Sequence, residues 1–157
     1  MKKIISMIFF MFSMVAFSED KAPDFILKDQ YGMVHTLEKY KGKIIFLNFW
    51  ATWCPPCKKE MPDVEKIYKE YGENKKDVVI LGVNSEESDK VKKFLSEKGY
   101  SFPTLIDENS EIMKKYYIQA FPTSFVIDKN GNIFGYVMGG LSKEQIKQVL
   151  DEVIKKY

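Results

Sequence analysis

Cys54 and Cys57 are the only cysteines of this 157-residue chain, and they form a C-x-x-C motif at the start of a predicted helix. Amide groups at a helix N-terminus lack intrahelical partners and carry positive potential, and both effects favour a thiolate over a thiol. We expect Cys54 to be exposed enough to attack a disulfide, and Cys57, one turn further along, to resolve the mixed disulfide. The spacing therefore predicts thiol-disulfide exchange.

Two other interpretations of the cysteine pair are weaker. A zinc site needs two more ligands, and the rest of the chain offers only His35 and carboxylates. A pair of inert buried cysteines is disfavoured, because C-x-x-C beside a β-α-β pattern is typical of redox motifs. We therefore expect neither a metal nor a cofactor.

The sequence predicts a strand before the motif and a helix after it, and these two elements would position the cysteines. Residues 43–49 are a nearly continuous apolar run, which predicts a central strand buried on both faces. Residues 56–71 carry apolar side chains at helical spacing, with Gly72 placed as the C-terminal cap. Pro62 is expected to kink this helix, because proline lacks the donor for the preceding turn.

Further elements alternate along the chain and end in a hairpin. Strands are expected at 25–27, 33–35, 78–83, 104–106, 124–127 and 133–137, and helices at 88–98, from 109 or 110 to 117, and after 142, with at most one helical turn at 36–40. Ser88 and Ser142 are predicted N-caps, and Asn130-Gly131 favours a tight turn between the last two strands. The order predicts an α/β fold with a mixed sheet and helices on both faces.

The first eighteen residues predict a targeting segment. Lys2 and Lys3 precede residues 4–17, which are apolar except for two serines, and a cut after Ser18 fits a signal-peptidase site. The run is short for a membrane span. We expect a cleaved signal peptide at 1–18, with an uncleaved anchor formed by residues 4–17 or a core helix as the alternatives. Residues 20–157 then form one domain, because no repeat or long linker interrupts them.

The charge pattern argues against nucleic acid as a partner. All 24 basic residues are lysines, although arginine is the side chain suited to bidentate contacts with phosphate or guanine. The net charge of +2 is accounted for by Lys2 and Lys3, so the predicted domain after them is neutral. We expect protein partners, no nucleic acid, and a monomer. Outside the cytosol, the state of the dithiol would depend on a reducing partner.

Several segments together resemble a known family. They are Ala22–Phe25, Gly42-Lys43, Leu47–Pro62 around the Trp53–Cys57 core, and Phe121-Pro122-Thr123. The chain resembles the exported thioredoxin-like thiol-disulfide oxidoreductases, in particular the TlpA/ResA type that works in cytochrome c maturation and related disulfide reduction. The resemblance implies a thioredoxin-like fold with a central mixed β-sheet, an extra N-terminal hairpin and a central βα insertion at about residues 72–99. It also implies disulfide-containing client proteins and a membrane thiol electron donor of the DsbD/CcdA type.

The resemblance also implies roles for single residues of the motif. Cys54 is then the nucleophile and Cys57 the resolving thiol of a redox-active disulfide. Glu60, three residues after Cys57 and on the same helical face, matches the active-site acid that exchanges a proton with Cys57. The alternative for Glu60 is a solvated carboxylate on the helix surface. Asn48 stands where cytoplasmic thioredoxins keep a buried aspartate, so Glu60 would have to supply the proton relay.

A second segment is expected to face the cysteines from far along the chain. The resemblance implies that Pro122 is cis, so that backbone groups of Phe121 face the thiols and can pair with a client strand. Thr123 would follow at the edge of the same site. A trans proline at the start of a strand is the alternative.

The remaining candidates lie within the motif and in one early strand. Of the two tryptophans, one should anchor the core and Trp53 should border the client groove. Pro55 and Pro56 remove amide donors that would stabilise a Cys54 thiolate, which predicts a moderately lowered thiol pKa and a reductase rather than a strong oxidant. His35 is predicted to be a surface residue of a strand, because nothing in the sequence suggests a geometry for base catalysis.

The sequence therefore predicts an exported thiol-disulfide oxidoreductase that reduces protein disulfides. A disulfide oxidase or isomerase using the same cysteines is the first alternative, because the direction of electron flow depends on the donor. A redox-inert binding module on a thioredoxin scaffold is the second, and retention of both cysteines argues against it. A peroxidase is disfavoured, because the chain has no arginine for such a site.

Overall fold

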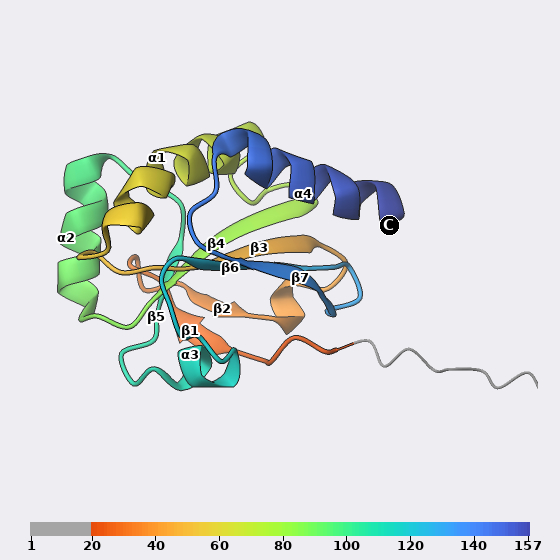
Figure 1. The fold of residues 1–157 in the computed structure, drawn as a ribbon. Helices are drawn as coiled ribbons and strands as arrows, with labels where there is room; N and C mark the ends of the chain where they lie inside the picture. The colour runs from red at the N-terminus through yellow and green to blue at the C-terminus, as the bar shows by residue number, and fades with distance from the viewer. Residues whose placement is uncertain (1–19) are drawn as a thin grey trace, which may run out of the picture.

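The computed structural model describes residues 20–157, in which a five-stranded mixed sheet is covered on both faces (Figure 1). The predicted signal peptide and anchor lie outside the described residues. The strands of this sheet are β3 (Ile44–Phe49), β4 (Val78–Asn84), β5 (Thr104–Ile106), β6 (Thr123–Ile127) and β7 (Ile133–Met138). Their order is β5-β4-β3-β6-β7, with β3 parallel to β4, β4 parallel to β5, and the remaining pairs antiparallel. The predicted mixed sheet is confirmed.

Two apolar clusters hold helices and a small hairpin against the sheet. One cluster packs α1 (Pro55–Glu70), α2 (Ser88–Lys98) and α4 (Lys143–Lys156) against one face. The other packs α3 (Glu111–Lys115) and the segment around the hairpin against the opposite face, as Figure 1 shows. The hairpin itself consists of β1 (Ile26–Lys28) and β2 (Val34–Thr36), followed by a 3-10 turn, η1 (Glu38–Tyr40). Every residue of β3 and β4 is buried, as expected for strands covered on both faces.

Local signals set the ends of several elements. α1 ends at Glu70, and Gly72 with φ +86° follows its C-cap, where a left-handed residue is favoured. The Ser142 hydroxyl accepts from the Gln145 amide in a capping box that starts α4, which confirms this predicted cap. The β6–β7 turn closes through a Gly131 N–H bond to the Asp128 carbonyl.

Two predictions for α2 and α3 need correction. Ser88 is not an N-cap, because it is the first helical residue and its amide donates to Glu108 Oε1. α3 is shorter than predicted, at Glu111–Lys115, and the carboxylate of Asp107 accepts from three of its amides. The stretch 72–99 contains α2 and also β4, which lies inside the sheet between β3 and β5.

The prediction that His35 is a surface residue is wrong. His35 is buried, and its two ring nitrogens contact the Tyr40 hydroxyl and Asp29 Oδ2, the latter at 2.8 Å. Asp29 also accepts from the amides of Tyr31 and Met33. The hairpin therefore covers a polar network in which His35 bonds to one residue before it and one after it in the chain. No periodic sequence pattern indicates these contacts.

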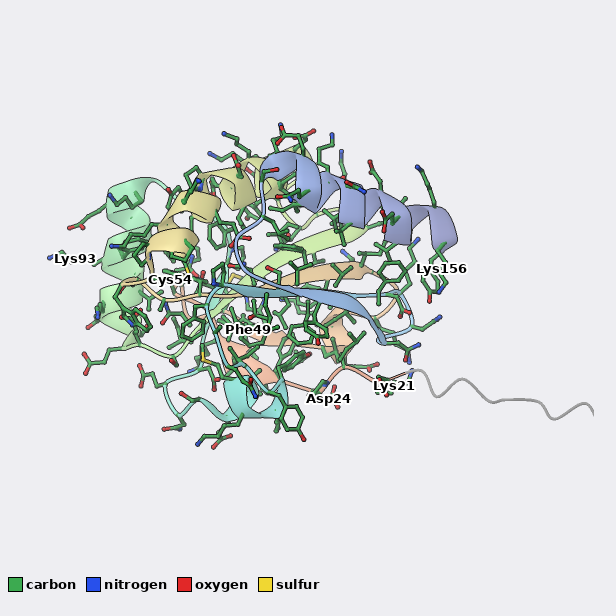
Figure 2. All side chains as sticks on the ribbon, in the orientation of Figure 1. Lys21, Asp24, Phe49, Cys54, Lys93 and Lys156 are labelled. Atoms are coloured by element: carbon green, nitrogen blue, oxygen red, sulfur yellow. A yellow bond between two sulfur atoms is a disulfide. The ribbon has the colours of Figure 1, made fainter. Side chains whose placement is uncertain are left out.

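The cysteine motif and the N-terminal end of the domain lie at opposite ends of the molecule. Figure 2 shows Cys54 beside the start of α1, with Lys21 and the α4 residue Lys156 at the other end. Among the described residues, no helix combines the length and apolarity needed to cross a membrane.

Candidate active site

Cys54 and Cys57 form a disulfide at the start of α1, with their Cα atoms 5.3 Å apart. Cys54 is the N-cap residue, and its Sγ accepts a hydrogen bond from the Cys57 amide at 3.3 Å. That amide points at the position where a thiolate would form after reduction, so the helix start stabilises negative charge on Cys54. Pro55 and Pro56 fill the first helical positions and supply no such donor.

The expectation that Cys54 is exposed is wrong for the disulfide form. Cys54 is 2% exposed and Cys57 is fully buried, because both belong to the apolar cluster that also holds Trp50 and Ala51. The exposed residues of the motif are Trp53, Pro55 and Pro56. Trp50 is the core anchor and Trp53, 63% exposed, lies at the surface, as predicted for the pair.

The cis-proline segment borders the motif. The Phe121-Pro122 peptide bond is cis, as the resemblance implies, and the ring of Phe121 meets the ring of Trp53 edge to face with centroids 5.9 Å apart. The Pro122 carbonyl accepts from the Gly139 amide, which ties this segment to the end of β7. Thr123 is buried at the start of β6, and its hydroxyl donates to the Ala120 carbonyl. The side chain of Thr123 is thus used within the segment.

Glu60 is a buried carboxyl rather than a solvated one, being 3% exposed. Its Oε1 accepts from the Leu141 amide at 3.0 Å, and its Oε2 accepts from Asn48 Nδ2 at 3.1 Å. Burial raises the pKa of Glu60 to about 7, although both hydrogen bonds lower it and nearby Asp63 raises it further. A carboxyl with this pKa can take up or release a proton near neutral pH.

A cavity of about 350 Å³ connects Glu60 with the surface on the α4 side of α1. It is lined by Glu60 together with Pro56, Lys59, Asp63, Gly140, Leu141, Ser142 and Gln145. Neither Cys54 nor Cys57 is among the residues that line this cavity.

Glu86 holds the loop that precedes Cys54, and sequence reasoning missed it. Its carboxylate accepts from the Thr52 amide at 2.7 Å, the Thr52 hydroxyl at 2.8 Å and Asn84 Nδ2 at 3.1 Å. Burial acts to raise the pKa of Glu86, but these bonds and an ion pair with Lys90 outweigh it, so the pKa is lowered. No sequence pattern links Glu86 to this loop, because Glu86 lies 34 residues from Thr52.

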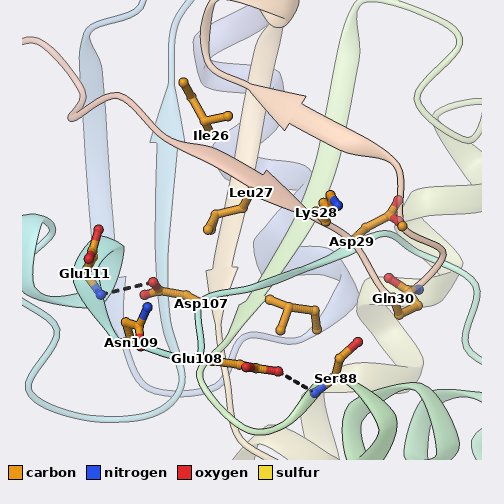
Figure 3. A pocket seen from close by; sticks show the side chains of 12 residues that line it. Ile26, Leu27, Lys28, Asp29, Gln30, Ser88, Asp107, Glu108, Asn109 and Glu111 are labelled. Carbon is orange, nitrogen blue, oxygen red and sulfur yellow. Dashed lines mark hydrogen bonds between the residues drawn. The ribbon is translucent and has the colours of Figure 1, made fainter.

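Another pocket, of about 430 Å³, lies between the hairpin and the start of α3, with no cysteine in its lining (Figure 3). Two of its acidic side chains already have partners, since Asp107 accepts from the Glu111 amide and Glu108 from the Ser88 amide. Within residues 20–157, no group of three or more histidine, cysteine or acidic side chains is arranged to hold a metal ion.

Comparisons with known proteins agree with this geometry. The model of the AhpC/TSA family matches residues 18–135. The thiol-disulfide oxidoreductase ResA of Geobacillus thermodenitrificans is 44% identical over 133 residues, which cover 84% of this chain and 75% of that protein. The chain belongs to the ResA-type thiol-disulfide oxidoreductases. ResA of Bacillus thuringiensis is 41% identical over 134 residues, covering 85% of this chain and 76% of its own.

Solved structures place the ResA-type chain in the thioredoxin-like fold. The exposed lipoprotein thioredoxin Etrx1 of Streptococcus pneumoniae is 33% identical with a TM-score of 0.75, over 83% of this chain and 99% of that chain. StoA of Bacillus subtilis is 33% identical with a TM-score of 0.71, over 81% and 96% of the two chains. The predicted fold class and thiol-disulfide oxidoreductase activity are thereby confirmed.

Proposed function

We propose that this oxidoreductase reduces disulfides of client proteins outside the cytoplasm, using Cys54 as nucleophile and Cys57 as resolving thiol. The observation that carries the proposal is the Cys54–Cys57 pair at the N-terminus of α1, with Cys54 Sγ accepting from the Cys57 amide. The electron pair comes from the reduced dithiol, and the products are two client thiols and the Cys54–Cys57 disulfide.

The reaction has two exchange steps. The Cys54 thiolate attacks one client sulfur, the client S–S bond breaks, and the other client sulfur leaves as a thiolate that takes up a proton. Cys57 then loses its proton and attacks Cys54 Sγ, which breaks the mixed disulfide and releases the second client sulfur as a thiolate that takes up a proton from solvent. Two electrons pass from the dithiol to the client, and the two protons taken up by the client balance those lost by Cys54 and Cys57.

Glu60 is proposed to accept the proton of Cys57 in the second step. It lies one helical turn beyond Cys57, is buried, and has a pKa of about 7, so its carboxylate is a base of suitable strength. The cavity beside Glu60 then allows the proton to reach solvent.

The client is proposed to bind across the surface formed by the motif and the cis-proline segment. Trp53, Pro55 and Pro56 are exposed there, and Phe121 contacts Trp53. Backbone groups of Phe121 can pair with an extended client strand, with Pro122 and Thr123 fixing the backbone that presents them.

Export, the electron donor and the direction of the reaction belong to the same proposal. Residues 1–18 act as a cleaved signal peptide or, if residues 4–17 are retained, as a membrane anchor. A membrane thiol protein of the DsbD/CcdA type returns the electrons, and the domain works as a monomer. Pro55 and Pro56 have no amide donors to stabilise a Cys54 thiolate, and this favours a reductase. A measured reduction potential of about −120 mV would instead favour an oxidase.

Trapping of mixed disulfides tests the cysteine roles. Cys57→Ala, expressed from the full chain in the native compartment, should accumulate client proteins bound to Cys54 that are released by dithiothreitol. Cys54→Ala is the matched control and should trap far less. If Cys54→Ala traps as much or more, the roles are reversed. If neither variant traps a protein, the proposed reduction of client proteins is wrong and the binding-module alternative gains support.

A further inference from the structure

The two polar atoms of the Asn48 side chain differ in their hydrogen bonding, since Nδ2 has two partners and Oδ1 has none among the described residues. Asn48 is fully buried in β3, and its Nδ2 donates to Glu60 Oε2 at 3.1 Å and to Ser124 Oγ at 2.9 Å. Its Oδ1 is buried and has no hydrogen-bond partner among residues 20–157. Leaving a buried carbonyl oxygen without a partner destabilises the folded state. Oδ1 is therefore an acceptor that is free to bind a donor.

The partners of Glu60 suit only its ionised form in the arrangement described. Both carboxylate oxygens receive donors, from the Leu141 amide and from Asn48 Nδ2. A protonated Glu60 carries an O–H that needs an acceptor, and Nδ2 cannot accept. Rotation of the Asn48 amide by half a turn exchanges Nδ2 with Oδ1 and brings the unpartnered oxygen to the place where that acceptor is needed.

We propose that Asn48 is a positioning residue whose side-chain amide turns over each time Glu60 gains or loses its proton. With Glu60 ionised, Nδ2 donates to Glu60 and to the Ser124 hydroxyl. With Glu60 protonated, Oδ1 accepts from the Glu60 O–H and from the Ser124 O–H. Ser124 fits both orientations because a hydroxyl group donates or accepts as required.

The inference deepens the proposed function and rests on Glu60 exchanging its proton with Cys57. In that exchange, Cys57–SH and Glu60–COO⁻ become Cys57–S⁻ and Glu60–COOH, so one proton moves and no atom is lost. Asn48 offers Oε2 of Glu60 a donor in one state and an acceptor in the other, so Oε2 keeps a hydrogen bond in both, while the atom at the far side of the amide has no partner among residues 20–157 in either state. The same amide that holds the carboxylate would therefore also hold the acid.

The charged groups near Glu60 do not offer this second partner. Lys59 and Asp63 on α1 line the cavity beside Glu60, and Asp63 also accepts from the Lys143 amide at the start of α4. On the sheet side, β3 and β6 contribute the neutral side chains of Asn48 and Ser124. Proximity of Asp63 raises the pKa of Glu60, but only Asn48 is hydrogen-bonded to its Oε2 among the described residues.

Nuclear Overhauser contacts of the Asn48 side-chain amide test the inference in the disulfide form of the full chain. At about pH 9, above the pKa of Glu60, the amide protons should contact the Glu60 Hγ and Ser124 Hβ protons. At about pH 5 both contacts should be lost as the nitrogen moves away. Contacts that persist unchanged at both pH values would overturn the inference, because the amide would then be fixed.

Three variants separate turning of the amide from a general effect of pH. Glu60→Gln cannot ionise, so the Asn48 amide contacts should be the same at both pH values; a change that persists in this variant would contradict the inference. Asn48→Leu keeps the volume and removes both the donor and the acceptor, so each form of Glu60 loses one hydrogen bond and the 13C-detected pKa of Glu60 should change by less than about one unit. The Ser124→Ala variant should also change the pKa little, because it leaves the Glu60–Asn48 bond in place. A rise of more than about one unit in Asn48→Leu would mean that Asn48 bonds only to the ionised form of Glu60, which would contradict the inference.

These readouts need no catalysis. Failure of Cys57→Ala to trap a client would contradict the proposed function without altering the amide contacts. Conversely, a fixed Asn48 amide in a chain that traps clients would contradict the inference alone.

Discussion

Glu60 and Glu65 are two buried carboxyl groups on the same helix, and their surroundings give them opposite properties. Glu60 is 3% exposed and Glu65 is 6% exposed, so burial opposes ionisation of both. Nevertheless, the pKa of Glu60 is raised to about 7, whereas the pKa of Glu65 is lowered. Burial alone therefore does not decide whether a carboxyl group exchanges protons.

The difference lies in the donors. Glu65 accepts from the Ser101 hydroxyl at 2.6 Å and from the amides of Ser101 and Phe102, and it also forms an ion pair with Lys69. These contacts outweigh the effect of burial on its pKa. Within residues 20–157, Glu60 receives one amide donor and one side-chain donor and forms no direct ion pair. Glu65 thus fastens α1 to the segment before β5, and Glu60 remains able to change its charge.

The largest expected effect that tests this comparison is on the pH dependence of stability. Glu60 ionises at about pH 7 in the folded protein and near its ordinary pKa of 4.5 when unfolded, so the folded state holds the extra proton between these values. Stability present at about pH 4.5 should therefore be lost as the pH rises through 7, by up to about 3 kcal/mol. Urea unfolding of the disulfide form would measure this.

Glu60→Gln is the reference for that measurement, because it keeps the shape of the side chain and cannot ionise. The stability difference between Glu60→Gln and the unaltered protein should grow in favour of the variant as pH rises. Identical pH profiles for the two proteins would show that Glu60 is ionised at its ordinary pKa and would remove the contrast with Glu65.

Glu65→Gln should show a smaller effect with the opposite sign. Its lowered pKa means that Glu65 contributes stability above the unfolded pKa of 4.5, and this contribution is lost as pH falls through the folded pKa. At pH 7 the variant should lose about 2 kcal/mol, because an amide group faces the two backbone donors in place of a carboxylate. Chemical denaturation at neutral and acid pH checks this, with the exposed Glu97→Gln on α2 as the control.

The smallest effect should come from Lys69→Gln, which removes the cation and leaves the hydrogen bonds of Glu65. Lys69 is more than half exposed, so its ion pair should contribute about 0.5 kcal/mol or less. The pKa of Glu65, followed by carbon-13 NMR, should stay below 4.5. A rise above that value would mean that the cation, rather than the donors, separates Glu65 from Glu60.

The sequence predicted features that depend on neighbouring residues. The C-x-x-C pair, the helix after it, the buried strand before it and the Asn130-Gly131 turn each have a local pattern, and the structure contains all four. The cis state of Pro122 followed from the resemblance of the Phe121-Pro122-Thr123 segment rather than from any local preference.

Features that depend on distant partners were missed. Glu86 and Thr52 are 34 residues apart, and the Leu141 amide that binds Glu60 is 81 residues away, so no periodicity connects them. His35 was predicted to be at the surface. Its contacts with Asp29 and Tyr40 form only when the hairpin packs, and no sequence pattern indicated them. The exposure of Cys54 was overestimated for the same reason, since the apolar cluster that covers it comes from several elements.

The placement of Cys54 and Lys21 at opposite ends of the domain has a consequence for a chain that keeps residues 4–17 as an anchor. The membrane would then hold the end of the domain that carries Lys21, while the disulfide faced away from the bilayer (Figure 2). Soluble clients could reach Cys54 without approaching the lipid surface. A membrane electron donor, in contrast, would need a domain of its own that extends past the width of this one, or a linker long enough to let the domain turn over.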